Sequence, residues 1–256
     1  MRGRRGERLQ WLKNNLASGG VVHLSNAAEQ CGVSQMTIRR DVDASRGELL
    51  LLAGRIFISD SLQSMSAYDL DAEKDSHLGI KQRLCAYAAD SIRADDTIFI
   101  DCGSTLVHLI GALDRDLPLT VVTYALNVAN AVSRLPNARL LLYGGLYHSS
   151  SQSFSGEHAS DALKRIGINK AFISAAGVHI ERGVSCFNFH EVAPKRAALE
   201  AAQQKILIAD ASKIDRVRPA FFADWDQFDT FITSRIEDDE ARFPATKTGQ
   251  PSVVQL

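Results

Sequence analysis

One stretch constrains the fold of this chain more than any other, residues 25–42, with the sequence SNAAEQCGVSQMTIRRDV. It predicts two short helices joined by a tight turn. Ser25 is a favourable N-cap for the first helix, and Gly32 can take the left-handed conformation that ends it. Ser34 is then the N-cap of the second helix, which we expect to run to about Val42.

Apolar residues on these two helices predict that the helices pack on each other. Ala28 and Cys31 share a face of the first helix, and Ile38 and Val42, four residues apart, share a face of the second. The pattern is typical of a helix-turn-helix, whose second helix enters the major groove of DNA. The residues that we expect to contact DNA are Ser34, Gln35, Thr37, Arg39 and Arg40.

The charged residues of the second helix are expected to have different roles. Arg39 and Arg40 should bind phosphates rather than base edges. Asp41 should be structural, since a carboxylate facing DNA would repel phosphate. A plainer interpretation stays open, because a glycine turn between helices occurs in many all-α domains and an Arg-Arg pair is often a solvated surface.

The flanking segments favour a winged helix-turn-helix over residues 1–58. A preceding helix is predicted by three leucines at helical spacing, Leu9, Leu12 and Leu16, with Trp11 beside them. Short β-prone runs at 49–52 and 55–58 predict a hairpin, to which residues 21–24 could add a third strand. Residues 1–56 contain nine Lys or Arg and five Asp or Glu, a formal charge of +4, whereas the chain carries −1 and the remainder therefore −5. A basic end on an otherwise acidic chain favours an anionic partner at that end.

Composition excludes several classes of protein. Hydrophobic residues make up 45%, enough for a sizeable core, but no apolar run approaches the ~20 residues of a membrane span. The basic N-terminus lacks the apolar segment of a secretory signal. The four cysteines are far apart and form no CxxC pair, so the sequence predicts neither a zinc site nor a disulfide framework. We expect a cytoplasmic protein without a metal or cofactor.

A polar segment at residues 59–76 is expected to be a linker, and the pattern then changes to alternating strands and helices. Strands are predicted at 98–100, 120–123, 139–143, 171–174, 206–209 and 231–233, and helices at 77–93, 106–113, 126–135, 156–165 and 192–204. This alternation predicts an α/β domain with a mostly parallel sheet at residues 77–236. Residues 237–256 are polar and are expected to form a mobile tail.

The residues that follow the predicted strands are candidate ligand contacts, because ligands of an open parallel sheet bind at the carboxyl ends of its strands. The first strand runs into Asp101 and then Gly103, Ser104 and Thr105 at a helix start, where free N–H groups favour phosphate. The candidate effector residues are Asp101, Gly103, Ser104, Thr105, Tyr124, Asn127, Gly144, Gly145, Gly177, Lys195, Asp210 and Lys213.

We expect Gly103, Ser104 and Thr105 to hold a phosphate and Lys213 to supply a cation. Asp101 and Asp210 would bind sugar hydroxyls or orient Lys213. Each feature also has an ordinary explanation, namely a helix cap, a plain turn or a surface ion pair. No Walker A or GxGxxG motif is present, so a small phosphorylated ligand is favoured over a nucleotide.

The helix-turn-helix at residues 32–42, GVSQMTIRRDV, closely resembles that of the DeoR family of bacterial sugar-metabolism repressors. The larger domain resembles the effector domain of that family at residues 101–105, 121–127, 143–145, 172–177 and 210–213. The first of these is usually D-x-G-T-T, and D-C-G-S-T here keeps the hydroxyl. The wing departs from the common family pattern, since it reads LLLLAGRIFIS rather than being rich in basic residues and Gly-Gly.

This resemblance implies a repressor that a sugar phosphate releases from its operator. We expect a homodimer or higher homo-oligomer, because one helix-turn-helix has little affinity by itself. Residues 174–188 and 213–220 look most like members that control deoxyribonucleoside breakdown, which implies deoxyribose 5-phosphate as the effector. The same architecture with another sugar phosphate, or acting as an activator, stays open.

A second resemblance, to ribose-5-phosphate isomerases, raises an enzyme as a competitor. Residues 102–113 look like their G-S-T phosphate loop and helix, and residues 205–213 look like the strand that ends in their Asp–Lys pair. Isomerisation needs a positioned carboxylate base. The isomerase aspartates are replaced by residues 174–177, SAAG, and the isomerase glutamate falls near Pro194 or Lys195, one helical turn from Glu191. The resemblance therefore implies a receptor with an isomerase-like fold rather than an enzyme.

Overall fold

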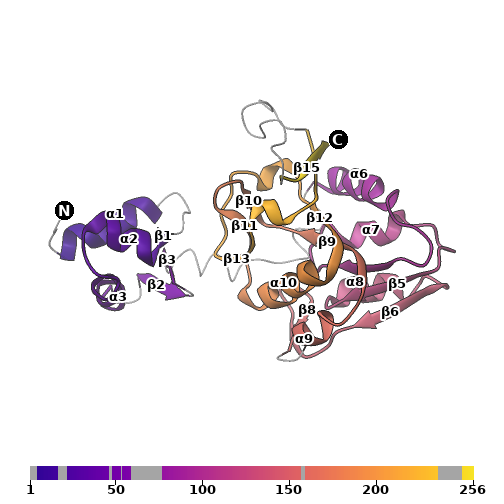
Figure 1. The fold of residues 1–256 in the computed structure, drawn as a ribbon, viewed down its shortest axis with the longest axis horizontal. Coiled ribbons are helices and arrows are strands. Elements are labelled where there is room, and N and C mark those ends of the chain that lie inside the picture. Colours follow the sequence, from indigo (N-terminus) through magenta and orange to yellow (C-terminus); the bar gives the residue numbers. More distant parts are fainter. Residues whose placement is uncertain are drawn as a thin grey trace. The chain divides into compact units, whose positions relative to one another are not determined.

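A computed structural model describes residues 5–16, 22–45, 48–52, 54–58, 77–156, 159–235 and 250–256. The chain divides into two compact units, one comprising residues 1–68 and 217–219 and the other the remaining residues (Figure 1). Each unit has its own hydrophobic core. The expected linker at 59–76 lies outside the described residues.

The N-terminal unit is a winged helix-turn-helix, as the sequence predicts. Its helices are α1 (Arg5–Leu16), α2 (Leu24–Cys31) and α3 (Gln35–Asp43). Its sheet has the order β1-β3-β2, formed by β1 (Val22–His23), β2 (Leu49–Leu52) and β3 (Arg55–Ile58). Leu52 pairs with Arg55, so the wing closes with a two-residue turn in which Gly54 has a φ of 77°.

The turn between α2 and α3 forms for the predicted reasons, but the start of α2 does not. Gly32 has a φ of 63°, and Ser34 Oγ accepts a hydrogen bond from the Thr37 N–H at 3.2 Å. Ser25 is not the N-cap of α2: the helix begins at Leu24, and His23 precedes it without a side-chain cap. The Leu24 N–H instead donates to Gly54 O at 2.9 Å, so the wing satisfies this donor.

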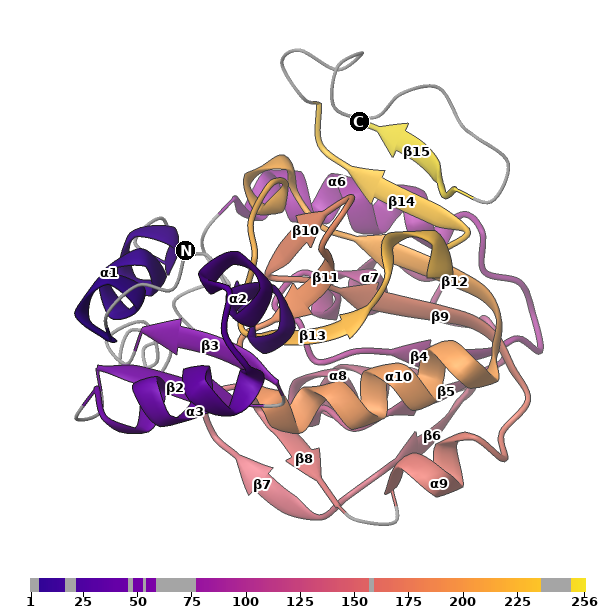
Figure 2. The ribbon, with the colours of Figure 1, turned by 60° about the vertical axis from the view of Figure 1, so that its left-hand side comes forward.

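The larger unit is built on a seven-stranded sheet with the order β15-β14-β12-β9-β4-β5-β6, and every pair of neighbours is parallel. Figure 2 shows this succession of strands. The strands are β4 (Thr97–Ile100), β5 (Leu119–Thr123), β6 (Ala138–Leu142), β9 (Ile168–Ser174), β12 (Ala202–Ile208), β14 (Thr230–Thr233) and β15 (Ser252–Gln255). The prediction of a mostly parallel sheet is confirmed.

Helices cover the sheet, with α10 in front of it and α6 and α7 behind it in Figure 2. Along the chain α6 packs on α7 and α7 on α8, whereas α9 packs on α10. Their bounds are α6 (Leu78–Ala89), α7 (Val107–Ala112), α8 (Leu126–Val132), α9 (Ala159–Leu163) and α10 (Val192–Ala201). No described helix has the length and apolarity needed to cross a bilayer.

Smaller elements lie on the carboxyl side of the sheet, and they were not predicted from the sequence. They are the hairpin of β7 (Leu146–His148) with β8 (Ser153–Ser155), and the antiparallel sheet of β10 (Gly177–His179), β11 (Gly183–Cys186) and β13 (Ala220–Ala223). Short 3₁₀ turns are η1 (Phe189–Glu191), η2 (Ala211–Lys213) and η3 (Trp225–Gln227). These runs are too short to carry a clear alternation of polar and apolar residues.

The helices expected at 77–93 and 126–135 end earlier, at Ala89 and Val132, and two segments belong to a different element from the one expected. Residues 252–255 belong to the sheet as β15, which pairs in parallel with β14, and are not part of a mobile tail. Residues 202–204, expected at the end of a helix, begin β12, where Gln204 pairs with Lys170. In both cases pairing with a neighbouring strand overrides the local polarity of the segment.

Candidate functional site

Helix α3 presents a polar surface opposite its packed face. Ile38 and Val42 are buried in the N-terminal core, whereas Gln35, Arg39 and Arg40 are exposed. A recognition helix needs this division, because it must pack on its own domain and still reach the groove. The structure therefore brings three of the five predicted DNA-contacting residues to one accessible surface.

The other two predicted contacts, Ser34 and Thr37, are engaged with each other. Their hydroxyl oxygens lie 3.0 Å apart, and Ser34 Oγ also caps the helix. Beside them Met36, which the sequence reading passed over, is 58% exposed in the first turn of α3. Apolar side chains at such positions can contact the methyl group of thymine. Met36 lies four residues before Arg40 and therefore on the same face of the helix, and this spacing could have identified it from the sequence.

Asp41 fastens α3 to α1, which confirms its predicted structural role. The carboxylate is buried and accepts two hydrogen bonds from the Arg8 guanidinium, from Nε at 2.7 Å and from Nη2 at 3.1 Å. This two-pronged geometry is among the stronger ionic contacts in proteins. Asp41 thus orients the recognition helix without facing DNA.

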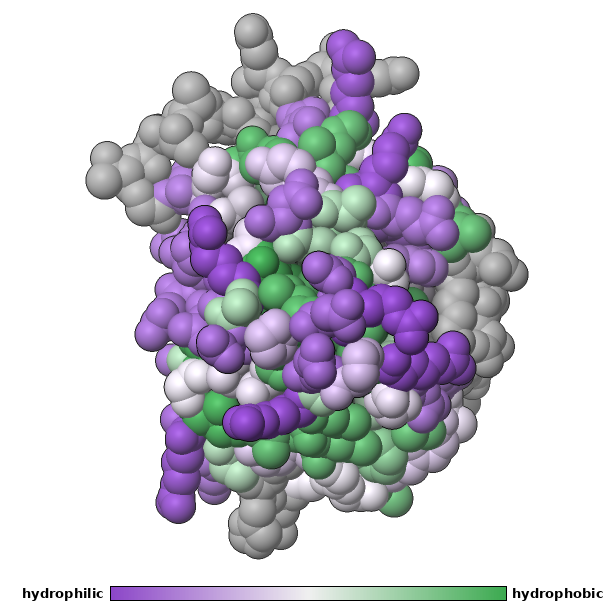
Figure 3. Space-filling model, turned by 90° about the vertical axis from the view of Figure 1, so that its right-hand side faces the viewer, coloured by the Kyte–Doolittle hydropathy of each residue, from purple (hydrophilic) through white to green (hydrophobic). Residues whose placement is uncertain are grey.

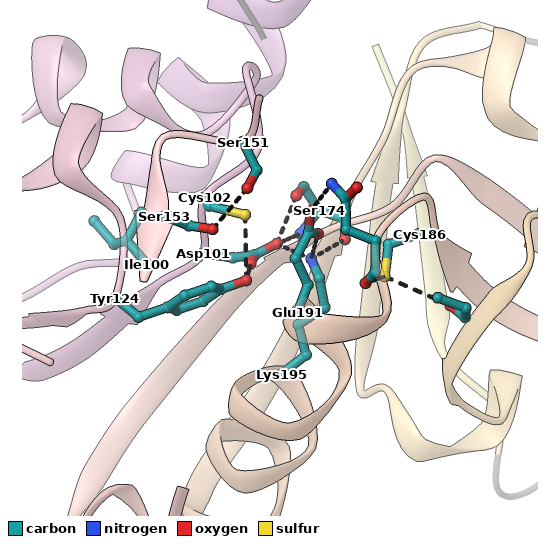
Figure 4. Close-up of polar contacts among 12 residues, drawn as sticks. Ile100, Asp101, Cys102, Tyr124, Ser151, Ser153, Ser174, Cys186, Glu191 and Lys195 are labelled. Carbon is teal, nitrogen blue, oxygen red and sulfur yellow. Dashed lines mark hydrogen bonds and ion pairs between the residues drawn. The ribbon is translucent and has the colours of Figure 1, made fainter. Parts of the chain in front are cut away.

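In the larger unit, three adjacent strands end in polar residues that meet in the interior. Asp101 follows β4, Tyr124 follows β5, and Ser174 is the last residue of β9. Glu191 and Lys195 approach from η1 and α10, and Figure 4 shows these side chains pointing toward one another. We call the five residues Asp101, Tyr124, Ser174, Glu191 and Lys195 the Asp101 network.

Both carboxylate oxygens of Asp101 are occupied by donors from the protein. Oδ1 accepts from Tyr124 OH at 2.6 Å, and Oδ2 accepts from Ser174 Oγ at 2.6 Å and from the Ser174 N–H at 3.0 Å. Oδ2 also pairs with Lys195 Nζ, which donates in addition to Ser174 O at 3.1 Å. Asp101 therefore positions its neighbours rather than offering a free acceptor for a sugar.

Electrostatics hold this network in one charge state. Burial by itself would raise the pKa of Asp101, but the charge and hydrogen bond of Lys195 and the bonds from Ser174 and Tyr124 lower it. Burial would likewise lower the pKa of Lys195, yet Asp101 and Glu191 raise it. Asp101 is therefore an anion and Lys195 a cation at neutral pH.

Glu191 belongs to this network although the sequence reading gave it no role. Its Oε1 accepts from Asn188 Nδ2 at 2.7 Å, and its Oε2 lies 3.7 Å from Lys195 Nζ. Burial raises its pKa, with Lys195 opposing the shift. Asp101, whose two oxygens both accept hydrogen bonds, has no free oxygen with which to abstract a proton as an isomerase base would.

The predicted phosphate loop lies beside a buried cation, Lys81, which was not predicted from the sequence. Ser104 and Thr105 are buried between β4 and α7, and Lys81 of α6, 1% exposed, donates to Ser104 Oγ at 3.1 Å. Gly103 packs so tightly that a Cβ there would lie 2.1 Å from Ser174 Oγ. The loop thus connects Lys81 on one side with the Asp101 network on the other.

Buried polar atoms without hydrogen-bond partners occur on α7 and α8 and at the end of β14. Among the described side chains they are His108 Nε2, Thr233 Oγ1 and both amide atoms of Asn127. Asn127 is 7% exposed, and α8, which carries it, packs on α7, which carries His108. A buried amide without hydrogen-bond partners costs free energy. The Asn127 amide is therefore a candidate for hydrogen bonds to a bound ligand.

Among the remaining predicted residues, Asp210, Gly145 and Gly177 have close local contacts. Asp210 is buried and accepts from the Ser212 N–H at 2.9 Å, and Lys195 rather than Lys213 is the cation on Asp101. A Cβ on Gly145 would lie 2.2 Å from Ser155 O, and one on Gly177 would lie 2.5 Å from Arg216 O, whereas Gly144 has open space around it. Close backbone packing therefore accounts for Gly145 and Gly177.

A winged helix-turn-helix joined to a buried polar site at the carboxyl ends of a parallel sheet defines a DNA-binding regulator with a ligand-sensing domain. Comparison with known proteins gives the same class. Residues 8–48 match the DeoR-like helix-turn-helix domain, and residues 76–235 match the DeoR C-terminal sensor domain.

The chain is 37% identical over 240 residues to the deoxyribose operon repressor of Escherichia coli K12, covering 94% of each protein. It is 29% identical to the transcriptional regulator IolR of Bacillus subtilis 168, covering 91% of this chain and 92% of the relative. Among solved structures it resembles ribose 5-phosphate isomerase A from Neisseria gonorrhoeae, with 16% identity and a TM-score of 0.39 over 52% of each chain.

The chain belongs to the DeoR family. It is a transcriptional repressor of that family and not an enzyme.

Proposed function

We propose that this repressor controls an operon for nucleoside or sugar catabolism in the cytoplasm and that deoxyribose 5-phosphate releases it from its operator. The proposal rests first on the 37% identity, over nearly the whole of both chains, to a protein named for the deoxyribose operon. It rests second on the buried Lys81–Ser104 contact, which offers a fixed cation to a phosphate.

In this proposal residues 1–58 bind DNA and α3 enters the major groove. Gln35 and Met36 approach base edges, and Arg39 and Arg40 hold phosphates. Ser34 and Thr37 keep the first turn of α3 in shape and can reach the backbone through their hydroxyl groups. Two copies of the domain read paired half-sites, as expected of a homodimer or higher homo-oligomer.

Residues 77–236 bind the effector. Gly103, Ser104 and Thr105 receive the phosphate, and Lys81 balances its charge. Asn127, whose amide has no partner among the described residues, takes a phosphate oxygen or a sugar hydroxyl. Tyr124, Lys195 and Asp101 fix the floor of the site, while Gly144, Gly145, Gly177, Asp210 and Lys213 remain the candidates along its sugar side.

Release from DNA follows by linkage. The effector must bind the DNA-free conformation more tightly, because a ligand with equal affinity for both states shifts nothing. A 100-fold loss of operator affinity corresponds to about 2.7 kcal/mol of coupling at ~1.4 kcal/mol per decade.

Isothermal titration calorimetry tests the effector. We expect saturable heat from deoxyribose 5-phosphate, less affinity for ribose 5-phosphate and none for deoxyribose, which lacks the phosphate. A gel shift with a duplex that the protein selects from a random pool should show release by the same compound. Folded protein that produces no heat with either phosphate would overturn the assignment.

Another sugar phosphate is the alternative effector. A relative named the glycerol-3-phosphate regulon repressor is 29% identical over 199 residues. The same titration with glycerol 3-phosphate separates the two. If glycerol 3-phosphate binds more tightly, it and not deoxyribose 5-phosphate is the effector, and the proposed phosphate site is unchanged. Separately, activation of transcription in a reporter assay would show that the protein is an activator rather than a repressor.

A further inference from the structure

The strand β6 is an uncovered apolar edge of the larger unit. It is the last strand of the described sheet, and Leu140, Leu141 and Leu142 are 36–44% exposed. Because side chains alternate along a strand, these leucines lie on both faces of the sheet. Leu146, 70% exposed, and Tyr147, 43% exposed, add to them from β7. Figure 3 views the larger unit from the right-hand side of Figure 1, where β5 and β6 lie at the bottom, and shows apolar residues gathered over its lower part.

Such an edge is unusual for a parallel sheet. The strands of parallel sheets are normally covered on both faces, and proteins protect free edges with charges, proline or short strands. At the opposite edge, β15 begins and ends with polar residues, Ser252 and Gln255. From Leu140 to Gly156 the chain contains no Asp, Glu, Lys or Arg, although these residues make up 23% of the whole.

We propose that β6 pairs with β6 of a second copy of this chain, in antiparallel register centred on Leu141, and that β7 adds to the contact. A two-fold axis places each residue against a position on an identical strand, so a strand can pair with itself. The inference rests on the proposed function only in its expectation of a homo-oligomer.

Charge singles out a second copy as the partner. The one charged residue of β6 is Arg139. With Leu141 on the axis, Leu140 faces Leu142 of the copy, and Arg139 faces the ring of Tyr143 rather than another arginine. A partner of strong charge would find no complement along Leu140–Leu142, whereas an identical neutral strand meets no repulsion and buries the leucines of both copies.

Cross-linking tests the register. In an antiparallel pair, residues opposite each other have Cα atoms about 4.5–5.5 Å apart, within the range that a disulfide spans. The four native cysteines are free and buried. Leu141→Cys should therefore give a covalent dimer under mild oxidation, and Leu78→Cys, at a leucine of similar exposure on α6, should not. Equal cross-linking of both variants, or none at Leu141→Cys, would overturn the register.

Charged substitutions at Leu141 test whether the β6 strands of two copies meet, with the molecular mass measured by light scattering. Wild type should have at least twice the chain mass, and Leu141→Lys and Leu141→Glu should each have half the mass of wild type, because the axis places like charges together. Mixing the two variants should restore the wild-type mass, and Leu78→Lys should retain it throughout. The lysine variant should also bind the selected operator about 100-fold more weakly, since two linked half-site contacts become one.

The outcomes separate this inference from the proposed function. A monomeric wild type, or a Leu141→Lys variant of unchanged mass and circular dichroism, rejects the interface. Calorimetry with deoxyribose 5-phosphate on the same samples reports on the effector independently, so either idea can fail while the other stands.

Discussion

The two units of the chain place their charged side chains in opposite environments. On α3, Arg39 and Arg40 are exposed and reach outward, whereas Asp101 and Lys195 are buried and satisfied by each other and by their neighbours. An exposed charge acts through water and is screened by salt, but a buried charge depends on every group that compensates it. Substitutions on the exposed surface of α3 should therefore leave the fold stable, whereas substitutions in the Asp101 network should destabilise it.

The largest effect is expected for Asp101→Asn. This change removes the anion that lies nearest the buried Lys195 ammonium and leaves only Glu191, 3.7 Å away, to balance it. The loss should cost about 3–5 kcal/mol in the free energy of unfolding. Urea denaturation of the variant against wild type measures it. The exposed Asp90, changed in the same way, is the control and should stay within ~0.5 kcal/mol of wild type. Equal stability of the two variants would mean that the network does not hold the fold.

Lys81→Met should affect effector binding more than folding. The methionine keeps much of the volume and removes a buried charge, whereas the loss of a charge-assisted hydrogen bond of about 1.5–3 kcal/mol should weaken deoxyribose 5-phosphate binding roughly 10- to 100-fold. Calorimetry measures the change. Lys164→Met, at an exposed lysine paired with Glu200 at 2.8 Å, should bind as wild type does. Unchanged affinity at Lys81→Met would move the phosphate elsewhere.

Arg40→Ala should leave the fold intact and weaken DNA binding on all sequences alike. The plot of log K against log salt has a negative slope, and the removal of one phosphate contact should make that slope shallower by ~0.9. Binding measured over a series of salt concentrations tests this, with Arg134→Ala in the larger unit as the control. If operator affinity and slope are both unchanged, Arg40 does not face the DNA backbone.

The smallest effect is expected for pH, at the stacked pair His148 and His190, whose ring centroids lie 3.6 Å apart. Burial, and then the neighbouring His148, lower the pKa of His190 to about 4. In the unfolded chain the histidine pKa is near ~6.5, so as the pH falls the unfolded chain binds this proton before the folded protein does. The stability that the neutral His190 contributes is therefore complete above ~6.5 and is lost as the pH falls to about 4. His190→Gln should therefore flatten the fall in melting temperature over this window. A variant that follows the wild-type curve would show that His190 does not resist protonation.

The sequence predicted those elements whose cause is local. Gly32 and Ser34 set the turn because one takes a positive φ and the other caps with its own hydroxyl. Apolar runs such as 98–100 and 171–174 predicted the central strands, since buried parallel strands are continuously hydrophobic. Segments whose pairing partner is distant were missed: β15 reads as a polar tail until β14 lies beside it.

The candidate site divides in the same way. The loop from Gly103 to Thr105 was found because its residues adjoin a strand and a helix start. Lys81 and Glu191 were not, since each reads as an ordinary helical surface residue and becomes buried when its element packs. Met36 was passed over because an exposed apolar residue cannot be told from a core residue by type alone.

By itself the sequence determined the class of this protein, because the helix-turn-helix and the strand-end motifs depend on short-range rules of capping, periodicity and turn geometry. The tertiary structure decided which charges meet. Asp101 pairs with Lys195 rather than Lys213, and Lys81 reaches Ser104 across 23 positions of sequence. The reason is physical: burial makes the cost of an unpaired charge large, and only the packed fold determines which opposite charge lies close enough to offset it.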